Sequence, residues 1–376
     1  MNIGIVCYAS VGGSGVVATE LAKALAGRQH RVHLVSSDMP FRLNEFHADL
    51  SFHQVHTPAY PLFREPQYVI SLANKLVQVA RQFELDIVHA HYAIPHATAA
   101  LLAQQVLASA GRPPRVVTTL HGTDITLVGN DPSFSEIVAF SIERSDAVTA
   151  VSRSLAASTR SELGVTRDIM VIPNFLDCSV FRRVDVPLLR QRFSCSGAEK
   201  VVIHVSNFRP VKRIDAVMQV FARIAQKVPA RLLLVGDGPE LGTVYRLGRE
   251  LAISHLVDAL GAQEGVIPLL SSADVFLLPS AQESFGLAAL EAMACEVPVV
   301  ASNVGGLPEV IEHGRTGFLH EPDDLDGMAA SAITLLEDPA LHARIAQAAR
   351  RHVTEPFCVD RVVPMYERCY ESVLQQ

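Results

Sequence analysis

The sequence lacks tryptophan, any Cys-x-x-Cys pair, an excess of positive charge and a bilayer-spanning apolar run. Because no uncharged run approaches the roughly 20 residues that cross a bilayer, we expect no membrane-spanning helix. The first residues, Met-Asn-Ile-Gly-Ile-Val, indicate a strand and not a signal peptide. A formal net charge of −7 argues against a surface that coats nucleic acid. The scattered cysteines are typical of reduced thiols that fill the core of a cytoplasmic protein: Cys7, Cys178, Cys195, Cys295, Cys358 and Cys369.

The 376 residues are enough for two α/β domains. Short apolar segments and longer amphipathic segments alternate along the whole sequence. Runs rich in Val, Ile and Leu alternate with longer amphipathic stretches, the pattern of βα units around a parallel sheet. In the first half the expected strands are residues 2–7, 31–36, 87–89, 116–119 and 147–151. In the second half they are residues 200–206, 231–236, 257–261, 275–279 and 297–301. The sequence therefore predicts two Rossmann-like α/β domains that face a central cleft.

The expected domain boundaries follow from the proline content and the periodicity. Residues 1–175 form the first domain, and residues 176–198, with weak periodicity and Pro187, form a linker. Residues 199–355 form the second domain. Residues 356–376 are predicted to be a C-terminal helix. Packing of this helix against the first domain is one arrangement that the sequence allows.

Two carboxylates at the start of one helix give the strongest functional signal. Glu283 follows a predicted strand, and Glu291 lies more than a turn into a helix expected over residues 285–295. The backbone N–H groups of Gly286 and Leu287 would then be free to bind a diphosphate. An isolated pair of glutamates is most often a helix-start acid and a solvated residue. Here the apolar neighbours predict a buried helix, where an unpaired charge is costly, so a ligand-binding role is favoured.

A basic cluster follows the first strand of the second half. Arg209 and Lys212 lie in the segment Ser206-Asn-Phe-Arg-Pro-Val-Lys-Arg213. Most short clusters of this kind are solvated turns. The position at the carboxyl end of a parallel strand favours a ligand, and fixed cations suit the anionic oxygens of a phosphate or diphosphate.

A glycine-containing turn joins the first strand to a helix. Gly13, Ser14 and Gly15 can expose amides to an anion there. The spacing Gly13-x-Gly15-x-x-Ala18, with Asp38 after the second strand, also resembles a dinucleotide-binding fingerprint. Because additional residues separate the strand from the glycines, the tight turn of that fingerprint is missing. We therefore expect no nicotinamide, flavin or other cofactor.

One histidine ends a strand of the first half. His121 lies beside Gly122 in Thr118-Thr-Leu-His-Gly-Thr-Asp124, where its ring can reach a ligand bound at the end of the strand. A lone histidine is more often structural, but the carboxyl end of a strand favours ligand contact.

Two patterns superficially suggest a metal. His89, His91 and His96 are closely spaced, but no neighbouring carboxylate or cysteine completes a site. Asp324-x-Asp326 follows a proline at an expected helix start, which helix capping explains. We expect no metal site.

These motifs together resemble the retaining GT-B glycosyltransferases, the family that includes sucrose-phosphate synthase. The resemblance covers essentially the whole chain and is carried by Pro279-Ser-Ala-Gln-Glu-Ser-Phe-Gly286, Glu291-Ala-Met-Ala294, Gly305-Gly-Leu-Pro-Glu309 and Gly314-Arg-Thr-Gly317. It implies that Glu283 contacts the transferred sugar and that Glu291 binds the ribose hydroxyls. It assigns the remaining donor contacts to Ser284, Phe285, Gly286 and Leu287. It assigns catalytic roles to His121, Lys212 and Glu283, and Arg209 is expected to take the role of a family arginine.

The sequence departs from the family pattern at two positions. Glu296 stands where a glycine is usual, which puts the local turn geometry in doubt. Asn207 stands where many members have an arginine, so Arg209 is expected to substitute, and Lys212 matches the family lysine in register.

Further segments resemble a narrower group within this family. They are Cys7-Tyr-Ala-Ser-Val-Gly-Gly-Ser-Gly15, Met39-Pro-Phe-Arg-Leu43, His89-Ala-His-Tyr92, His121-Gly-Thr-Asp-Ile125 and His204-Val-Ser-Asn-Phe-Arg209. The resemblance implies UDP-N-acetylglucosamine as donor, L-malate as acceptor and a role in bacillithiol biosynthesis. The amides, hydroxyls and side chains expected to bind the small dicarboxylate are those of Gly13, Ser14, Gly15, Tyr92 and Thr119.

No enzymatic nucleophile is evident, so retention would require attack on the same face that the leaving diphosphate vacates. The protein would then contribute positioning and charge stabilisation, without a metal. Three alternatives stay open. They are transfer to another small acceptor such as inositol or a sugar phosphate, a UDP-N-acetylglucosamine 2-epimerase, and a binding module that holds a nucleotide sugar without chemistry.

Overall fold

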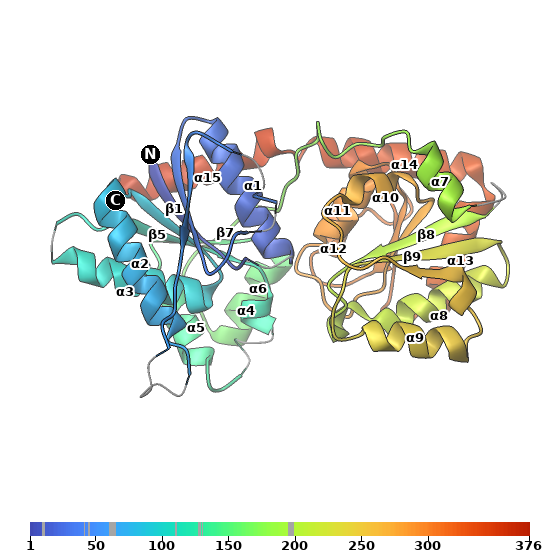
Figure 1. The fold of residues 1–376 in the computed structure, drawn as a ribbon, viewed down its shortest axis with the longest axis horizontal. Coiled ribbons are helices and arrows are strands. Elements are labelled where there is room, and N and C mark those ends of the chain that lie inside the picture. The colour runs from blue at the N-terminus through green and yellow to red at the C-terminus, as the bar shows by residue number, and fades with distance from the viewer. Residues whose placement is uncertain are drawn as a thin grey trace. The chain divides into compact units, whose positions relative to one another are not determined.

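The structure is a computed structural model that describes residues 1–9, 12–40, 42–43, 46–59, 65–109, 111–126, 129, 131–194 and 199–376. The chain divides into two compact units. The first consists of Met1–Asn174 and Val359–Gln376, and the second of Phe175–Cys358. Each unit is built on one parallel sheet with helices on both faces (Figure 1).

The first unit contains a seven-stranded sheet in the order β3-β2-β1-β4-β5-β6-β7. Its strands are β1 (Asn2–Val6), β2 (Arg31–Ser36), β3 (Leu50–Gln54), β4 (Ile87–His91), β5 (Arg115–Leu120), β6 (Ala147–Ala150) and β7 (Ile169–Val171). Its helices are α1 (Gly13–Gly27), α2 (Tyr68–Phe83), α3 (Thr98–Ala108), α4 (Thr123–Thr126), α5 (Ser135–Arg144), α6 (Arg153–Leu163) and α15 (Val359–Leu374). A π-helical turn, Ala93–Ala97, follows β4.

The second unit contains a six-stranded sheet in the order β10-β9-β8-β11-β12-β13. Its strands are β8 (Lys200–Val205), β9 (Ala230–Val235), β10 (Val257–Ala259), β11 (Val275–Leu278), β12 (Val299–Ser302) and β13 (Phe318–His320). Its helices are α7 (Pro187–Phe193), α8 (Ile214–Ala225), α9 (Leu241–Glu250), α10 (Val266–Ser271), α11 (Leu287–Ala294), α12 (Leu307–Val310), α13 (Leu325–Glu337) and α14 (Pro339–Thr354). Two 3-10 turns, Pro210–Lys212 and Ser254–Leu256, complete the unit.

Alternating side chains of the buried strands form separate cores on the two faces of each sheet. In the first unit, Val88 of β4 packs with α2 and α3, whereas His89 points to the opposite face and meets α15. In the second unit, Leu232 and Leu234 of β9 pack with α8, α9 and α13. The central strands are therefore fixed from both sides, and their carboxyl ends hold the loops that follow in place.

The chain returns to the first unit through α15. Glu367 accepts hydrogen bonds from Arg28 (2.9 Å), and its carboxylate lies 3.0 Å from the His30 ring. The Tyr370 hydroxyl lies 2.8 Å from Nδ1 of His89. The segment expected as a linker belongs, from Phe175 onward, to the second unit and contains α7.

All ten strands expected from the sequence are present, within a few residues of the expected bounds. The structure adds β3, β7 and β13. No helix in the described part of the chain is long and apolar enough to cross a membrane.

The expectation that all cysteines are reduced core thiols is wrong for two of them. Cys178 and Cys358 form a disulfide, although they are 180 residues apart in the sequence. Such a pairing depends on proximity in the fold, which cysteine spacing does not reveal. Cys7, Cys295 and Cys369 are free and buried, as expected, and Cys195 lies outside the described residues.

Candidate active site

Each sheet has a point where the strand order reverses, and in open parallel sheets ligands bind at the carboxyl ends of the strands there. In the first unit, β1 lies between β2 and β4, so the loops after β1 and β4 leave in opposite directions. In the second unit, β8 lies between β9 and β11 in the same way. Nearly all the candidate residues follow these strands or their neighbours.

In the second unit, Lys212 and Glu283 meet at this point. Lys212 follows β8 and Glu283 follows β11, and the lysine ammonium forms an ion pair with the glutamate Oε1. Their side chains are only 20% and 10% exposed. The Ser280 hydroxyl lies 3.4 Å from the same oxygen, and the backbone N–H of Ala281 donates to the carbonyl of Val211 (2.8 Å). The two loops are thus joined by side-chain and backbone contacts, which fixes the cation beside the carboxylate.

A series of hydrogen bonds links the loop after β8 to β11. Nδ1 of buried His204 donates to the carbonyl of Leu277 (2.8 Å), so Nε2 accepts from the Ser206 hydroxyl (2.8 Å). The Ser206 oxygen in turn accepts from the N–H of Phe208 (3.2 Å). Burial lowers the pKa of His204 to about 4, so the ring is neutral at neutral pH. These bonds hold the backbone as far as Phe208. The next residue, Arg209, is exposed at the start of the 3-10 turn.

Two glycines after β12 lie where the backbones of neighbouring loops approach too closely for side chains. A Cβ at Gly305, whose φ is +54°, would lie 1.9 Å from the carbonyl oxygen of Glu283. A Cβ at Gly306 would lie 2.3 Å from the carbonyl oxygen of Ser284, and the N–H of Gly306 donates to Glu283 O (2.9 Å). The loop after β12 therefore supports the loop that carries Glu283.

A second glycine pair was not assigned a role from the sequence. Gly236 and Gly238 follow β9, and a Cβ at either would lie about 2 Å from the carbonyl oxygens of Ser206 or Asn207 (1.7 Å and 2.1 Å). The signal that points to them is the same one that points to Gly305, namely glycines directly after a parallel strand.

Helix α11 begins beside this ion pair. Its N-cap residue, Gly286, has a φ of +96°, and a Cβ there would lie 2.5 Å from a methyl carbon of Leu307. The helix covers Leu287–Ala294, so Phe285 and Gly286 precede it. Glu291 is 6% exposed, as the apolar neighbours predicted. Its charge helps to raise the pKa of the Cys295 thiol to about 12, second to burial.

In the first unit, α1 starts directly after β1 and its loop. Gly12 is the N-cap residue, and in the described residues no side chain caps the helix, so the first amides, including those of Gly13 and Gly15, point out of the N-terminus. Tyr92, which follows β4, donates a hydrogen bond from its hydroxyl to the Ser14 hydroxyl (2.8 Å). Burial raises the pKa of Tyr92 to about 12. The structure thus brings Gly13, Ser14, Gly15 and Tyr92 together at the reversal point of the first sheet.

His121 lies at the end of β5, with its Nε2 2.8 Å from Nδ1 of His91. Burial is the main cause that lowers its pKa to about 3, so it is a neutral imidazole at neutral pH. Asp124 accepts hydrogen bonds from the backbone N–H groups of Ala93 (3.1 Å) and Gly122 (3.0 Å). Burial raises the pKa of this carboxyl to about 6. Asp124, which had no assigned role, thereby ties the loop after β4 to the loop after β5.

Thr119 does not lie with the other acceptor candidates. Its hydroxyl is fully buried on the α15 side of the sheet, 2.7 Å from Nε2 of His89 and 2.7 Å from the hydroxyl of Thr149. The alternation of side chains along β5 turns it into the core, so its hydroxyl positions His89 and is not presented to a ligand.

The patterns that superficially suggested a metal have structural roles. Asp324 is the N-cap of α13 and accepts from the N–H of Gly327 (2.9 Å), which confirms the capping interpretation. His89 bonds to Tyr370 and Thr119, and His96 donates to the carbonyl of His91 (2.5 Å). In the part of the chain that the structure describes, no group of three or more histidine, cysteine or acidic side chains is arranged to hold a metal ion.

Comparison with known proteins places this geometry in a family. Residues 186–352 match the family model "Glycosyl transferases group 1", and residues 11–180 match "Glycosyltransferase Family 4". The solved structure of sucrose-phosphate synthase from Thermosynechococcus elongatus superposes with a TM-score of 0.83 at 22% identity, over 100% of this chain and 99% of that one. HepE from Anabaena, solved with UDP-glucose, superposes with a TM-score of 0.82 at 23% identity, over 99% and 100%. Two Rossmann-like units with these neighbours define the GT-B fold, and both family models are models of glycosyltransferases.

A curated relative narrows the family. The chain is 48% identical over 375 residues to the N-acetyl-alpha-D-glucosaminyl L-malate synthase of Bacillus anthracis. The alignment covers 100% of this chain and 98% of that protein. The chain belongs to the glycosyltransferase family of this synthase.

Proposed function

We propose that the enzyme transfers N-acetylglucosamine from UDP-N-acetylglucosamine to the hydroxyl of L-malate, with retention, as a step of bacillithiol biosynthesis in the cytoplasm. The observation that carries the proposal is the Lys212–Glu283 pair at the reversal point of the second sheet, in a chain 48% identical throughout to a synthase of that product. A nucleotide sugar with an α-linked phosphate and an α-linked product have the same configuration, so the transfer retains it.

The second unit would bind the donor. Lys212, paired with Glu283 beside the start of α11, and the exposed Arg209 would meet the diphosphate, together with the amides contributed by residues Ser284 to Leu287. Glu283 would contact the transferred sugar, and Glu291 the ribose hydroxyls. Because Lys212 is paired with Glu283 here, the diphosphate must compete with the carboxylate for the ammonium group.

The first unit would bind the acceptor. The amides of Gly13, Ser14 and Gly15 at the start of α1 suit one carboxylate of malate. The hydroxyls of Ser14 and Tyr92 are hydrogen-bonded to each other and suit the second half of the molecule. His121, a neutral imidazole, can exchange a hydrogen bond with a sugar hydroxyl but does not supply a charge.

The transfer balances without a covalent enzyme intermediate. The bond between the sugar C1 and the β-phosphate oxygen breaks, and the malate hydroxyl oxygen bonds to C1 on the same face. The hydroxyl proton passes to the departing phosphate oxygen, and UDP leaves. Lys212 and Arg209 stabilise the charge that grows on the diphosphate, which lowers the barrier by electrostatic preorganisation. No step requires a divalent metal.

An acceptor screen tests the proposal. The enzyme is incubated with UDP-N-acetylglucosamine and, separately, malate, inositol, a sugar phosphate or water, and UDP release is followed. We expect UDP release with malate and none with the others. Release only with inositol or a sugar phosphate would replace malate as the acceptor, and conversion of the UDP-sugar without any acceptor would indicate an epimerase. UDP binding without turnover on any acceptor would indicate a binding module.

A further inference from the structure

The described cysteines occupy two kinds of environment. Cys7, Cys295 and Cys369 are free and fully buried, and burial raises the pKa of their thiols to about 12, about 12 and about 11. These thiols stay protonated and out of contact with small oxidants. Cys178 and Cys358 are half-buried and bonded to each other, so the pair is the accessible sulfur site among the described cysteines.

The bridge joins the two ends of the second unit. That unit runs from Phe175 to Cys358, and Cys178 lies close to its first residue. The two segments already run side by side, because the N–H of Leu176 donates to the carbonyl of Phe357 (3.1 Å). The Cα atoms of the two cysteines are 5.6 Å apart, a separation typical of disulfides.

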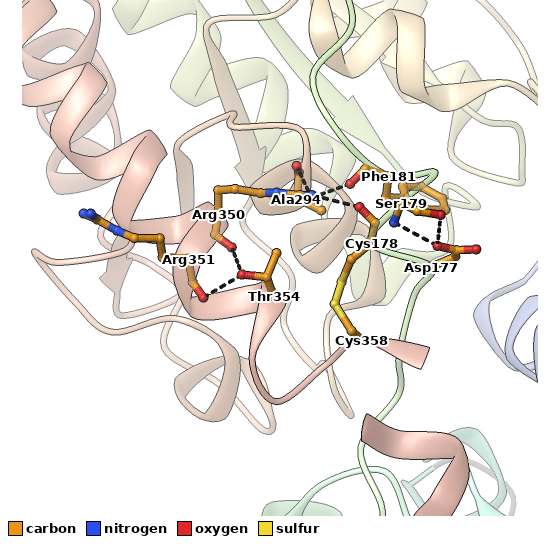
Figure 2. Close-up of a disulfide and its surroundings, with 9 residues drawn as sticks. All are labelled: Asp177, Cys178, Ser179, Phe181, Ala294, Arg350, Arg351, Thr354 and Cys358. Atoms are coloured by element: carbon orange, nitrogen blue, oxygen red, sulfur yellow. Dashed lines mark hydrogen bonds between the residues drawn. A yellow bond between two sulfur atoms is a disulfide. The ribbon is translucent and has the colours of Figure 1, made fainter. Parts of the chain in front are cut away.

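The segment around Cys178 is held without the sulfur bond (Figure 2). The guanidinium of Arg350, on α14, donates to the carbonyl oxygens of Cys178 (2.8 Å) and Ala294 (2.8 Å), and also to that of Phe181. Opening the bridge therefore leaves Cys178 anchored to α14 and to the end of α11. On the other side, Phe357 keeps its hydrogen bond from the N–H of Leu176, so Cys358 loses one of the two links between its segment and that of Cys178.

That side is in contact with the proposed donor loop. Phe357, the residue before Cys358, packs its ring edge-to-face against Phe285, with the ring centroids 5.6 Å apart and the planes at 77°. The two rings are 6% and 3% exposed. Phe285 lies between Ser284 and Gly286, directly before α11. A restraint on Cys358 is thus a restraint on Phe357 and, through the ring contact, on the loop that begins at Glu283.

We propose that Cys178 and Cys358 form a reversible thiol–disulfide site for small-molecule disulfides, and that its oxidation state sets the affinity of the adjacent site for UDP. The proposal rests on the donor site proposed above. In the oxidising direction one cysteine thiolate attacks a small disulfide and releases one thiolate. The second cysteine attacks the mixed disulfide, closes the bridge and releases the other thiolate. Two cysteine thiols are oxidised and one small disulfide is reduced to two thiols.

The oxidised form is the one that binds UDP more tightly. The closed bridge holds Phe357 against Phe285 and so keeps the loop in the arrangement in which Glu283 and the start of α11 are placed. The reduced form must restrict that segment again when the nucleotide binds, which weakens binding. We expect reduction to weaken UDP affinity about fivefold, at the lower end of the factors that couple two sites in one protein.

The first measurement maps the sulfur chemistry on the full chain. The protein is equilibrated in mixtures of glutathione and glutathione disulfide, alkylated and analysed by peptide mass spectrometry. We expect Cys178 and Cys358 to change together and reversibly, while Cys7, Cys295 and Cys369 stay protected from alkylation in the folded protein. A pair that stays reduced in excess glutathione disulfide, or stays bonded in excess dithiothreitol, would overturn the reversible site.

The second measurement is a UDP titration of the oxidised and the reduced wild type by calorimetry. The double variant Cys178→Ser/Cys358→Ser should bind like the reduced protein and ignore redox conditions, whereas Cys369→Ala should respond like wild type. Phe357→Leu keeps an apolar side chain at this buried position but removes the ring edge, so its two redox states should bind UDP alike. Equal UDP affinity of oxidised and reduced wild type would refute the coupling while leaving the transferase proposal intact. Binding of UDP in neither state would instead refute the donor site and the coupling with it.

Discussion

Replacing Lys212 by alanine tests the donor half of the site most sharply. Lys212 is the side chain paired with Glu283, and both are largely shielded from water, at 20% and 10% exposed. The substitution removes a fixed cation from the place where the leaving diphosphate would gain charge. Loss of one such preorganised group typically lowers turnover by about 10²–10³, or about 3–4 kcal/mol in the barrier.

The effect on affinity should be smaller. In the free enzyme the ammonium group is already engaged by the carboxylate, so a bound diphosphate replaces one anionic partner by another. Most of the lysine's contribution is therefore expected as the bond to C1 breaks, and turnover should fall more than UDP affinity. Glu283→Gln keeps the shape and frees the lysine, so it should bind UDP at least as tightly as wild type while losing turnover.

The assay compares initial rates of UDP release with calorimetric UDP affinity for wild type and variants. Lys227→Ala is the matched control, because this exposed lysine lies just after the far end of α8. Thermal unfolding of each variant shows that the fold is retained. A fall in turnover of less than about tenfold for Lys212→Ala, or an equal fall in affinity and turnover, would refute this role.

Four further predictions address the other parts of the account. Gly13→Val should raise the KM for malate strongly and change UDP affinity little, because a side chain would block the amides of α1; a change in UDP affinity alone would assign the loop to the donor. Glu291→Ala should weaken UDP binding with the fold intact, and unchanged affinity would remove its ribose role. Activity should survive exhaustive chelation with EDTA, and a loss restored by magnesium or manganese would contradict the metal-free mechanism. Burial lowers the pKa of His89 to about 3 and of His204 to about 4, so below the unfolded value of about 6.5 the unfolded chain binds protons that the folded protein does not. The free energy of unfolding is therefore highest above pH ~6.5 and should fall by about 1.4 kcal/mol per pH unit for each histidine as pH drops toward 4; urea denaturation should show this decline, and a flat profile would contradict it.

The sequence was sufficient for the central strands because these are buried on both faces and therefore form continuous apolar runs. The strands it missed are at sheet edges: β3 and β7 border the first sheet and β13 the second. The side chains of β3 and β13 are only partly buried or exposed, so their sequences lack a continuous apolar run. The central cleft expected between the two halves stays a prediction.

The candidate site was predictable where function depends on a residue's place along a strand, and not where it depends on the direction of a side chain. Lys212 and Glu283 each follow a strand that flanks the reversal point, which is visible in the sequence. Thr119 also lies near the carboxyl end of a central strand, yet its hydroxyl points into the core toward His89. At Glu296, where the family pattern has glycine, the backbone keeps the conformation that favours glycine, with a φ of +58°, although the residue carries a side chain.

The central claim is the reaction itself, and the structure of its product tests that claim most directly. The enzyme is incubated with UDP-N-acetylglucosamine and L-malate, and the product is examined by proton NMR at the anomeric position. The account predicts one new α-linked N-acetylglucosaminyl malate for each UDP released. A β-linked product would contradict retention, and UDP release or sugar conversion without any malate adduct would contradict the proposed acceptor.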